Sequence, residues 1–177
     1  MTEFGREYGE GLYALCAEEK LEKPVLEELR ALKDTFRQNE AFLKLLGNMS
    51  MSKQERVRIV DDTLRGQVHE YTLSFLKILV ERGAVHEFSE CAAAYQDCYY
   101  REHQTAVAEV TTARALTPAQ RGRLKEKLAR ITGKEIVIKE KIDPSLMGGV
   151  LLQMDGKRYD NTVRHRLAAI KQTMTEE

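Results

Sequence analysis

Residues 139–160 have the sequence Lys139-Glu-Lys-Ile-Asp-Pro-Ser-Leu-Met-Gly-Gly-Val-Leu-Leu-Gln-Met-Asp-Gly-Lys-Arg-Tyr-Asp160, which carries the clearest β-strand pattern in the chain. Asp143-Pro144 interrupts an apolar run, because proline lacks an N–H and restricts the residue before it. Gly148 and Gly149 then permit a backbone conformation or a close approach that a Cβ would prevent. Residues 150–154 alternate as a strand does, and Asp155-Gly156 predicts a two-residue hairpin turn. The segment therefore predicts a small sheet, and it contains no catalytic constellation.

The residues on either side extend this sheet into an α+β unit. Thr105–Thr112 is short and rich in β-branched residues, which predicts a strand. Thr117-Pro-Ala-Gln120 has a capping-box pattern with proline at the first helical position, so a helix follows. Ile136–Ile142 predicts the next strand. After the hairpin, Asp160 is expected to cap a final helix whose apolar face is Val163, Leu167, Ile170 and Met174.

The first hundred residues predict a bundle of about six short helices, one of which opens at the capping-box pattern Ser52-Lys-Gln-Glu55. In the first helix, apolar residues recur at three- and four-residue steps: Phe4, Tyr8, Leu12, Leu15 and Cys16. The helix expected at Glu70–Arg82 is apolar over most of its circumference, which is typical of a central helix or of one that lends a face to a partner. The fold class is therefore mainly α, with a helical bundle over residues 1–104 and a small α+β domain over residues 105–177.

Charge divides the chain in a similar way, although the formal net charge is zero. Met1–Ala113 has 14 basic and 20 acidic residues, whereas Arg114–Lys171 has 14 basic and 6 acidic residues. Such a split indicates two halves with different partners. Neither a signal peptide nor a membrane span is expected, because no window is apolar enough.

No catalytic or cofactor-binding pattern emerges from the remaining polar residues. The four histidines are far apart without metal-ligand spacing, and the glycine pair lacks the sequence of a phosphate loop. The three cysteines fall at apolar helical positions and are expected to be reduced and buried: Cys16, Cys91 and Cys98. The basic second half leaves one alternative open, a helical adaptor with a basic RNA-binding module. The scarcity of aromatic residues for base stacking favours protein contact or plain solvation of the basic face instead.

Four passages, in the same order along nearly the whole chain, resemble the delta subunit of the bacterial F-type ATP synthase, a member of the oligomycin-sensitivity-conferring protein family. They are Tyr8–Ala17, Phe75–Val85, Val110–Ala113 followed by Leu116–Gln120, and Ile142–Val150 with Tyr159-Asp160, Val163-Arg164 and Arg166-Leu167. The last is the most specific.

This resemblance implies a non-catalytic subunit that takes part in ATP synthesis and hydrogen ion transport without a cofactor or metal. Such a subunit belongs to the stator, where it ties the catalytic head to the peripheral stalk and resists rotor torque. The helical half would bind the N-terminal amphipathic helix of an alpha subunit, and the second half would bind the C-terminal end of the b-subunit dimer. The protein would be a peripheral membrane protein at the cytoplasmic face of the bacterial cell membrane. It would contact the membrane only through the complex and would bind no nucleic acid.

The first helix and the Glu70–Arg82 helix carry more apolar residues than one core face needs. We therefore expect an alpha-subunit-binding groove lined by Tyr8, Leu12, Leu15, Phe75 and Leu79. The simpler interpretation is that all five are ordinary core residues. Four residues are expected to form structural turns in the sheet that carries the stalk-binding face: Gly148, Gly149, Asp155 and Gly156.

Overall fold

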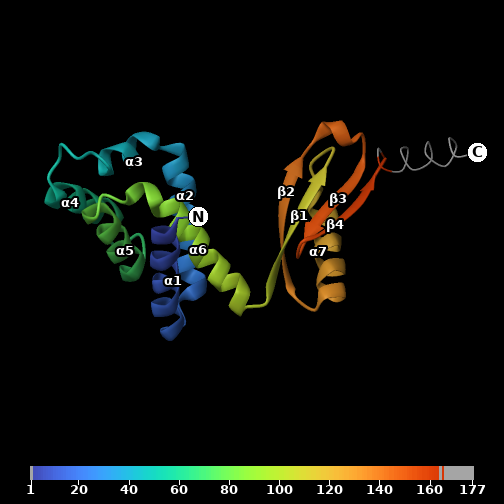
Figure 1. Cartoon of the computed structure of the whole chain (residues 1–177), viewed down its shortest axis with the longest axis horizontal. Helices are drawn as coiled ribbons and strands as arrows, with labels where there is room; N and C mark the ends of the chain where they lie inside the picture. Colours follow the sequence, from blue (N-terminus) through green and yellow to red (C-terminus); the bar gives the residue numbers. More distant parts are fainter. Residues whose placement is uncertain (1, 164, 166–177) are drawn as a thin grey trace, which may run out of the picture. The chain divides into compact units, whose positions relative to one another are not determined.

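The computed structural model describes residues 2–163 and 165. The chain divides into two compact units, Met1–Arg101 and Glu102–Glu177. The first unit is helical, and the second combines a four-stranded sheet with a helix, as Figure 1 shows. The predicted fold class, mainly α with a small α+β part, is confirmed.

The first unit packs its helices around one apolar core. The most deeply buried residues come from different helices and include Val25, Leu29, Leu76 and Tyr95. The helices are α1 (Glu3–Glu18), α2 (Glu22–Gln38), α3 (Glu40–Leu46), α4 (Lys53–Leu64), α5 (Glu70–Glu81) and α6 (Phe88–Glu102). A 3₁₀ turn, η1 (Val85–Glu87), precedes α6. All three cysteines are reduced and buried in this unit, as predicted.

Local capping chemistry sets several helix boundaries where the sequence predicts them. The Ser52 hydroxyl accepts the Glu55 N–H at 3.2 Å, while the Glu55 carboxylate accepts the Ser52 N–H at 3.0 Å. Thr117 and Gln120 form the same reciprocal pair at the start of α7 (Pro118–Thr132). Each pair satisfies two N–H groups that the first turn of a helix leaves without a partner.

The second unit is a mixed sheet with the strand order β2-β1-β3-β4. Its strands are β1 (Thr105–Thr112), β2 (Glu135–Ile142), β3 (Gly149–Met154) and β4 (Lys157–Thr162), and a 3₁₀ turn, η2 (Pro144–Leu146), precedes β3. β1 pairs with β2 in parallel, and α7 makes the crossover between them. The β1–β3 and β3–β4 pairs are antiparallel. Alternate β1 residues and Ile136 form a small core with Leu128 of α7.

The predicted final helix lies largely outside the described residues: Leu167, Ile170 and Met174 belong to that part of the chain. Val163 and His165 already have helical backbone. The prediction that Asp160 caps this helix is wrong, because Asp160 belongs to β4 and accepts hydrogen bonds from Thr162. The Thr162 hydroxyl, not Asp160, accepts the His165 N–H at 3.1 Å.

Candidate functional site

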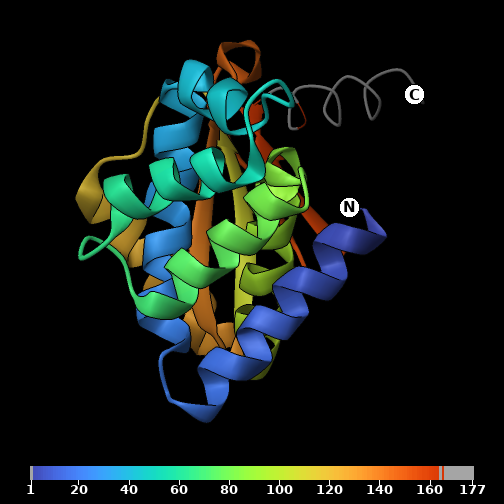
Figure 2. The same ribbon diagram turned by 90° about the vertical axis from the view of Figure 1, so that its left-hand side faces the viewer.

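An apolar groove of about 310 Å³ lies between α1 and α5, which run side by side in Figure 2. The lining residues recur at helical spacing on both sides. From α1 they are Glu7, Tyr8, Gly11, Leu12 and Leu15, and from α5 they are Tyr71, Ser74, Phe75 and Ile78. Two of these apolar side chains remain open to solvent, since Leu15 is 54% exposed and Ile78 is 42% exposed. Such a groove suits the apolar face of another helix.

The structure brings four of the five predicted groove residues together: Tyr8, Leu12, Leu15 and Phe75 line the groove. Leu79 does not line it, because its side chain has no exposed surface and belongs to the core of the first unit. Ile78 lines the groove in place of Leu79. The four groove residues of α5 follow the spacing of one helical stripe, whereas Leu79 lies on the neighbouring stripe that enters the core.

A carboxylate from α2 holds the start of α5 in place. Glu28 accepts the backbone N–H of His69 at 2.9 Å and the Thr72 hydroxyl at 2.6 Å. Since the N-terminus of a helix carries a partial positive charge, a carboxylate here is favourable in its electrostatics as well as in its hydrogen bonds. The second wall of the groove is therefore anchored to the bundle by a polar contact between distant segments.

Two glycines bring α1 close to α6. A Cβ at Gly9 would lie 2.4 Å from the Cys91 carbonyl oxygen and 2.7 Å from the Ala94 Cβ, and one at Gly5 would lie 2.6 Å from the Glu90 Cβ. Beyond this contact, the Tyr13 and Tyr95 rings meet edge to face with centroids 5.3 Å apart. These contacts fix one face of α1 against the core, so that its neighbouring face forms the groove wall. The apolar periodicity of α1 gives no sign that Gly9 is a contact residue.

The predicted turn residues of the second unit occupy two different kinds of position. Asp155 and Gly156 have φ values of +49° and +73° and connect β3 to β4, which confirms the two-residue hairpin. At Gly149, φ is +85°, and a Cβ would lie 2.3 Å from the Asn161 carbonyl oxygen of the neighbouring strand. Gly148 supplies a carbonyl that accepts the Val163 N–H at 3.1 Å. Only Gly149 is therefore required for close strand packing.

Burial explains the shifted ionisation of the thiols and the core tyrosine. Desolvation raises the pKa of Cys91 to about 11 and also raises the pKa of Cys16 and of Tyr95. A thiol with a raised pKa is a poor nucleophile at neutral pH, which fits a packing role for these cysteines. Among the residues that the structure describes, no group of three or more histidine, cysteine, aspartate or glutamate side chains is arranged to hold a metal ion.

The sequence matches one known protein family along almost its whole length. The ATP synthase delta (OSCP) subunit family matches residues 5–174. The chain belongs to this family.

Individual relatives align with this chain along almost their whole length. The ATP synthase subunit delta of Clostridium kluyveri is 31% identical over 169 residues, covering 96% of this chain and 93% of the relative. The chloroplastic ATP synthase subunit delta of Emiliania huxleyi is 29% identical over 164 residues, covering 92% of this chain and 91% of the relative. One chain of the Toxoplasma gondii mitochondrial ATP synthase hexamer superposes with a TM-score of 0.72 at 17% identity, covering 99% of this chain and 98% of that chain, which shows a shared fold.

This delta-family chain is a non-catalytic stator subunit of an F-type ATP synthase, and it sits within that complex. It is a peripheral subunit of a membrane-bound assembly. In the described part of the chain, no helix is both long enough and apolar enough to cross a membrane. The alternative of a helical adaptor with an RNA-binding module finds no support in the family match or the relatives.

Proposed function

We propose that the α1–α5 groove binds the N-terminal amphipathic helix of an alpha subunit and so attaches the stator to the catalytic head. The observation that carries this proposal is the pair of exposed apolar side chains, Leu15 and Ile78, in a groove whose floor includes Leu12 and Phe75. The core of the first unit leaves these two side chains uncovered. Burying them against a second apolar helix would be favourable.

Ile78→Asp and Leu15→Asp test this assignment. Because both positions are exposed in the free protein, the substitutions should leave the fold intact and should act on the groove. Loss of about 2 kcal/mol of apolar burial predicts an affinity about 30-fold weaker or worse for a peptide with the sequence of the alpha N-terminal helix. Isothermal titration calorimetry with the full chain measures this. Leu79→Asp is unsuitable, since it would place a charge in the core.

Leu45→Asp is the matched control, because Leu45 is an apolar side chain with 39% exposure on α3, outside the groove. It introduces the same charge and should leave peptide affinity unchanged. Equal affinities for the groove variants and the wild type would refute the groove assignment. If Leu45→Asp and Ile78→Asp lost the same amount of peptide affinity, the effect would come from the added charge and not from the groove.

For the second unit, we propose contact with the C-terminal end of the b-subunit dimer. Glu102–Glu177 has 14 basic and 10 acidic residues, whereas Met1–Arg101 has 14 basic and 18 acidic residues. A positive unit associates faster with an acidic partner, and salt screens that attraction. The association rate with a fragment from the C-terminal end of the b-subunit dimer should therefore fall as salt rises. A rate insensitive to salt would contradict the electrostatic part of this proposal.

We place the protein at the cytoplasmic face of the bacterial membrane, because a subunit that holds the head and the stalk together lies on the side where the head lies. Protease treatment of inverted membrane vesicles should degrade it, whereas intact right-side-out vesicles should protect it. Degradation only in the right-side-out vesicles would overturn this placement.

A further inference from the structure

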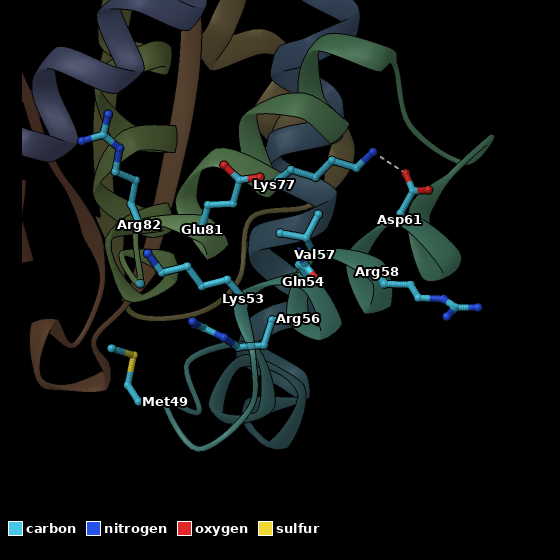
Figure 3. A pocket seen from close by; sticks show the side chains of 11 residues that line it. Met49, Lys53, Gln54, Arg56, Val57, Arg58, Asp61, Lys77, Glu81 and Arg82 are labelled. Atoms are coloured by element: carbon cyan, nitrogen blue, oxygen red, sulfur yellow. Dashed lines mark ion pairs between the residues drawn. The ribbon is translucent and has the colours of Figure 1, made fainter.

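A second cavity, of about 970 Å³, lies between α4 and α5 on the part of the first unit shown in Figure 3. It is separate from the apolar groove and differs from it in chemistry, because charged side chains dominate its lining. Five lining residues are cationic, namely Lys53, Arg56, Arg58, Lys77 and Arg82, whereas two are acidic, namely Asp61 and Glu81.

Arg56 is the unusual member of this set, because it is a charged side chain with only 2% of its surface exposed. Its Nη1 donates to the carbonyl oxygen of Leu46 at 3.1 Å, at the C-terminal end of α3. Its Nε is buried and has no hydrogen-bond partner. No ion pair joins Arg56 to a carboxylate in the described part of the chain. One carbonyl therefore satisfies one of the five N–H groups of this guanidinium.

The nearby acidic groups are engaged elsewhere or lie apart. The Lys77 ammonium and then the Arg65 guanidinium hold the pKa of Asp61 below its usual range, and both contact its carboxylate. Arg58 pairs with Asp62 at 3.5 Å and extends away from Arg56 in Figure 3. The remaining acidic lining residue, Glu81, forms no ion pair with Arg56 among residues 2–163 and 165.

Two exposed cations remain beside Arg56. Lys53 and Arg82 line the same cavity, and neither forms an ion pair within the described residues. Figure 3 shows the head groups of Lys53 and Arg56 extending to the same side of α4, whereas the Arg82 guanidinium extends away from both. The cavity lining thus includes one buried and two exposed positive groups that have no acidic partner in the described structure, and two of them, Arg56 and Lys53, extend to the same side.

A buried arginine keeps its charge, since its guanidinium does not lose a proton in proteins. Removing such a charge from water is costly unless a counter-charge or a full set of hydrogen bonds compensates for it. We propose that this cavity is an oxyanion-binding site, in which Arg56 and Lys53 hold a phosphate or carboxylate group and the exposed Arg82 adds positive charge to the lining. The planar guanidinium matches the paired oxygens of both groups, and hydrogen bonds between charged partners are the strongest of their kind.

The ligand has two possible sources with the same chemistry. It is either a free anion from solution or a carboxylate carried by a neighbouring protein of the complex. Inorganic phosphate is a suitable probe, because it offers the required oxygens without any protein surface. Phosphate binding at this cavity does not depend on the α1–α5 groove, so the two assignments fail independently.

The first experiment compares thermal unfolding of the full chain in phosphate and in chloride at equal ionic strength. A ligand that binds only the folded state raises the unfolding midpoint, and a tighter ligand raises it more at the same concentration. Lys53→Gln/Arg82→Gln alters only exposed side chains and should weaken phosphate binding about tenfold or more. The matched control, Lys23→Gln/Lys44→Gln, removes the same charge from exposed positions outside the cavity and should keep the phosphate-specific shift.

Arg56→Lys reports on the buried position itself, since it retains the positive charge but loses the guanidinium fork. It should reduce the phosphate shift while leaving the far-UV circular dichroism unchanged. If it folds poorly, the double variant of the two exposed cations still decides the question. The proposal is overturned if phosphate gives no shift beyond chloride, or if the Lys53→Gln/Arg82→Gln variant keeps the full shift.

The second experiment identifies the source by using the assembled ATP synthase. If a neighbouring carboxylate occupies the site, Lys53→Gln/Arg82→Gln should lower the salt concentration at which this protein dissociates from purified complexes, relative to the control variant. If the ligand is a free anion, both variants should be retained equally while only the cavity variant loses the phosphate shift.

Discussion

Replacing Gly9 with alanine tests how tightly α1 must pack on α6 for the groove to form. The new Cβ would lie 2.4 Å from the Cys91 carbonyl oxygen and 3.1 Å from the Tyr95 backbone nitrogen. Ordinary contacts between carbon and oxygen begin near ~3.3 Å, so the two helices would have to separate locally by about 1 Å. Because the obstructing atoms belong to helix backbone, no side-chain rotation can relieve the contact.

The magnitude follows from two opposing effects. Forcing a methyl group into a packed contact costs about 3 kcal/mol when backbone must move, while alanine gains about 1 kcal/mol over glycine in helix propensity. Gly9→Ala should therefore lower the free energy of unfolding by about 2 kcal/mol. Gly11 is in the same helix, and a Cβ there would meet nothing within 4 Å. Gly11→Ala should stabilise the protein by about 1 kcal/mol.

Urea unfolding of the full chain measures this contrast. Six of the seven tyrosines precede residue 101, so the near-ultraviolet circular dichroism of tyrosine follows the first unit rather than the sheet. The chain has two units and need not unfold in one step, so the tyrosine signal should be compared with that of the backbone. If Gly9→Ala unfolds at the same urea concentration as Gly11→Ala, the close α1–α6 packing inferred from the structure is wrong.

Three further changes test other contacts. Gly149→Ala should lower the free energy of unfolding by about 3 kcal/mol or more, since it combines a positive φ with a contact against the next strand. Gly156→Ala should lower it by only about 1–2 kcal/mol, because only its positive φ is unfavourable. Equal losses of stability in urea unfolding would contradict the role of Gly149. Glu28→Gln should weaken the anchor of α5 and increase hydrogen exchange of the His69 amide, and unchanged exchange would exclude that role. The Leu116 N–H and the Arg121 guanidinium hold the pKa of Glu140 below its usual range, so the carboxylate stabilises the fold above its unfolded pKa of about 4.3. That stabilisation is lost as pH falls through the lower folded pKa. The difference in free energy of unfolding between the wild type and Glu140→Gln should therefore disappear at acid pH, and a difference that persists there would refute this.

Features set by adjacent residues were predictable from the sequence. The Ser52 and Thr117 capping boxes and the Asp155-Gly156 hairpin all form as expected, because each depends on hydrogen bonds or φ values within four residues. The prediction at Asp160 failed for a related reason. Aspartate and threonine both cap helices well, and only the end of β4 decides which of them meets the next N–H.

Features set by packing between helices were only partly predictable. Ile78 and Leu79 are adjacent apolar residues, and periodicity alone assigns both to the wide apolar face of α5. Which one enters the core depends on where α1 and α2 lie, which the sequence pattern does not specify. Arg56 was missed because a charged residue on a short helix is normally expected to face solvent. Its burial follows from the position of the Leu46 carbonyl at the end of α3.

One helix, α5, contributes to both surfaces of the first unit. Phe75 and Ile78 face the apolar groove, while Lys77 and Glu81 line the cationic cavity. Between these stripes, Leu76, Leu79 and Val80 are fully buried, so the helix is held firmly by the core. Apolar contact is not directional and alone would let a bound helix slide along the groove. A charged contact has a defined geometry, so a partner carboxylate in the cavity would fix the register of the attachment, which is the property that a stator under torque requires.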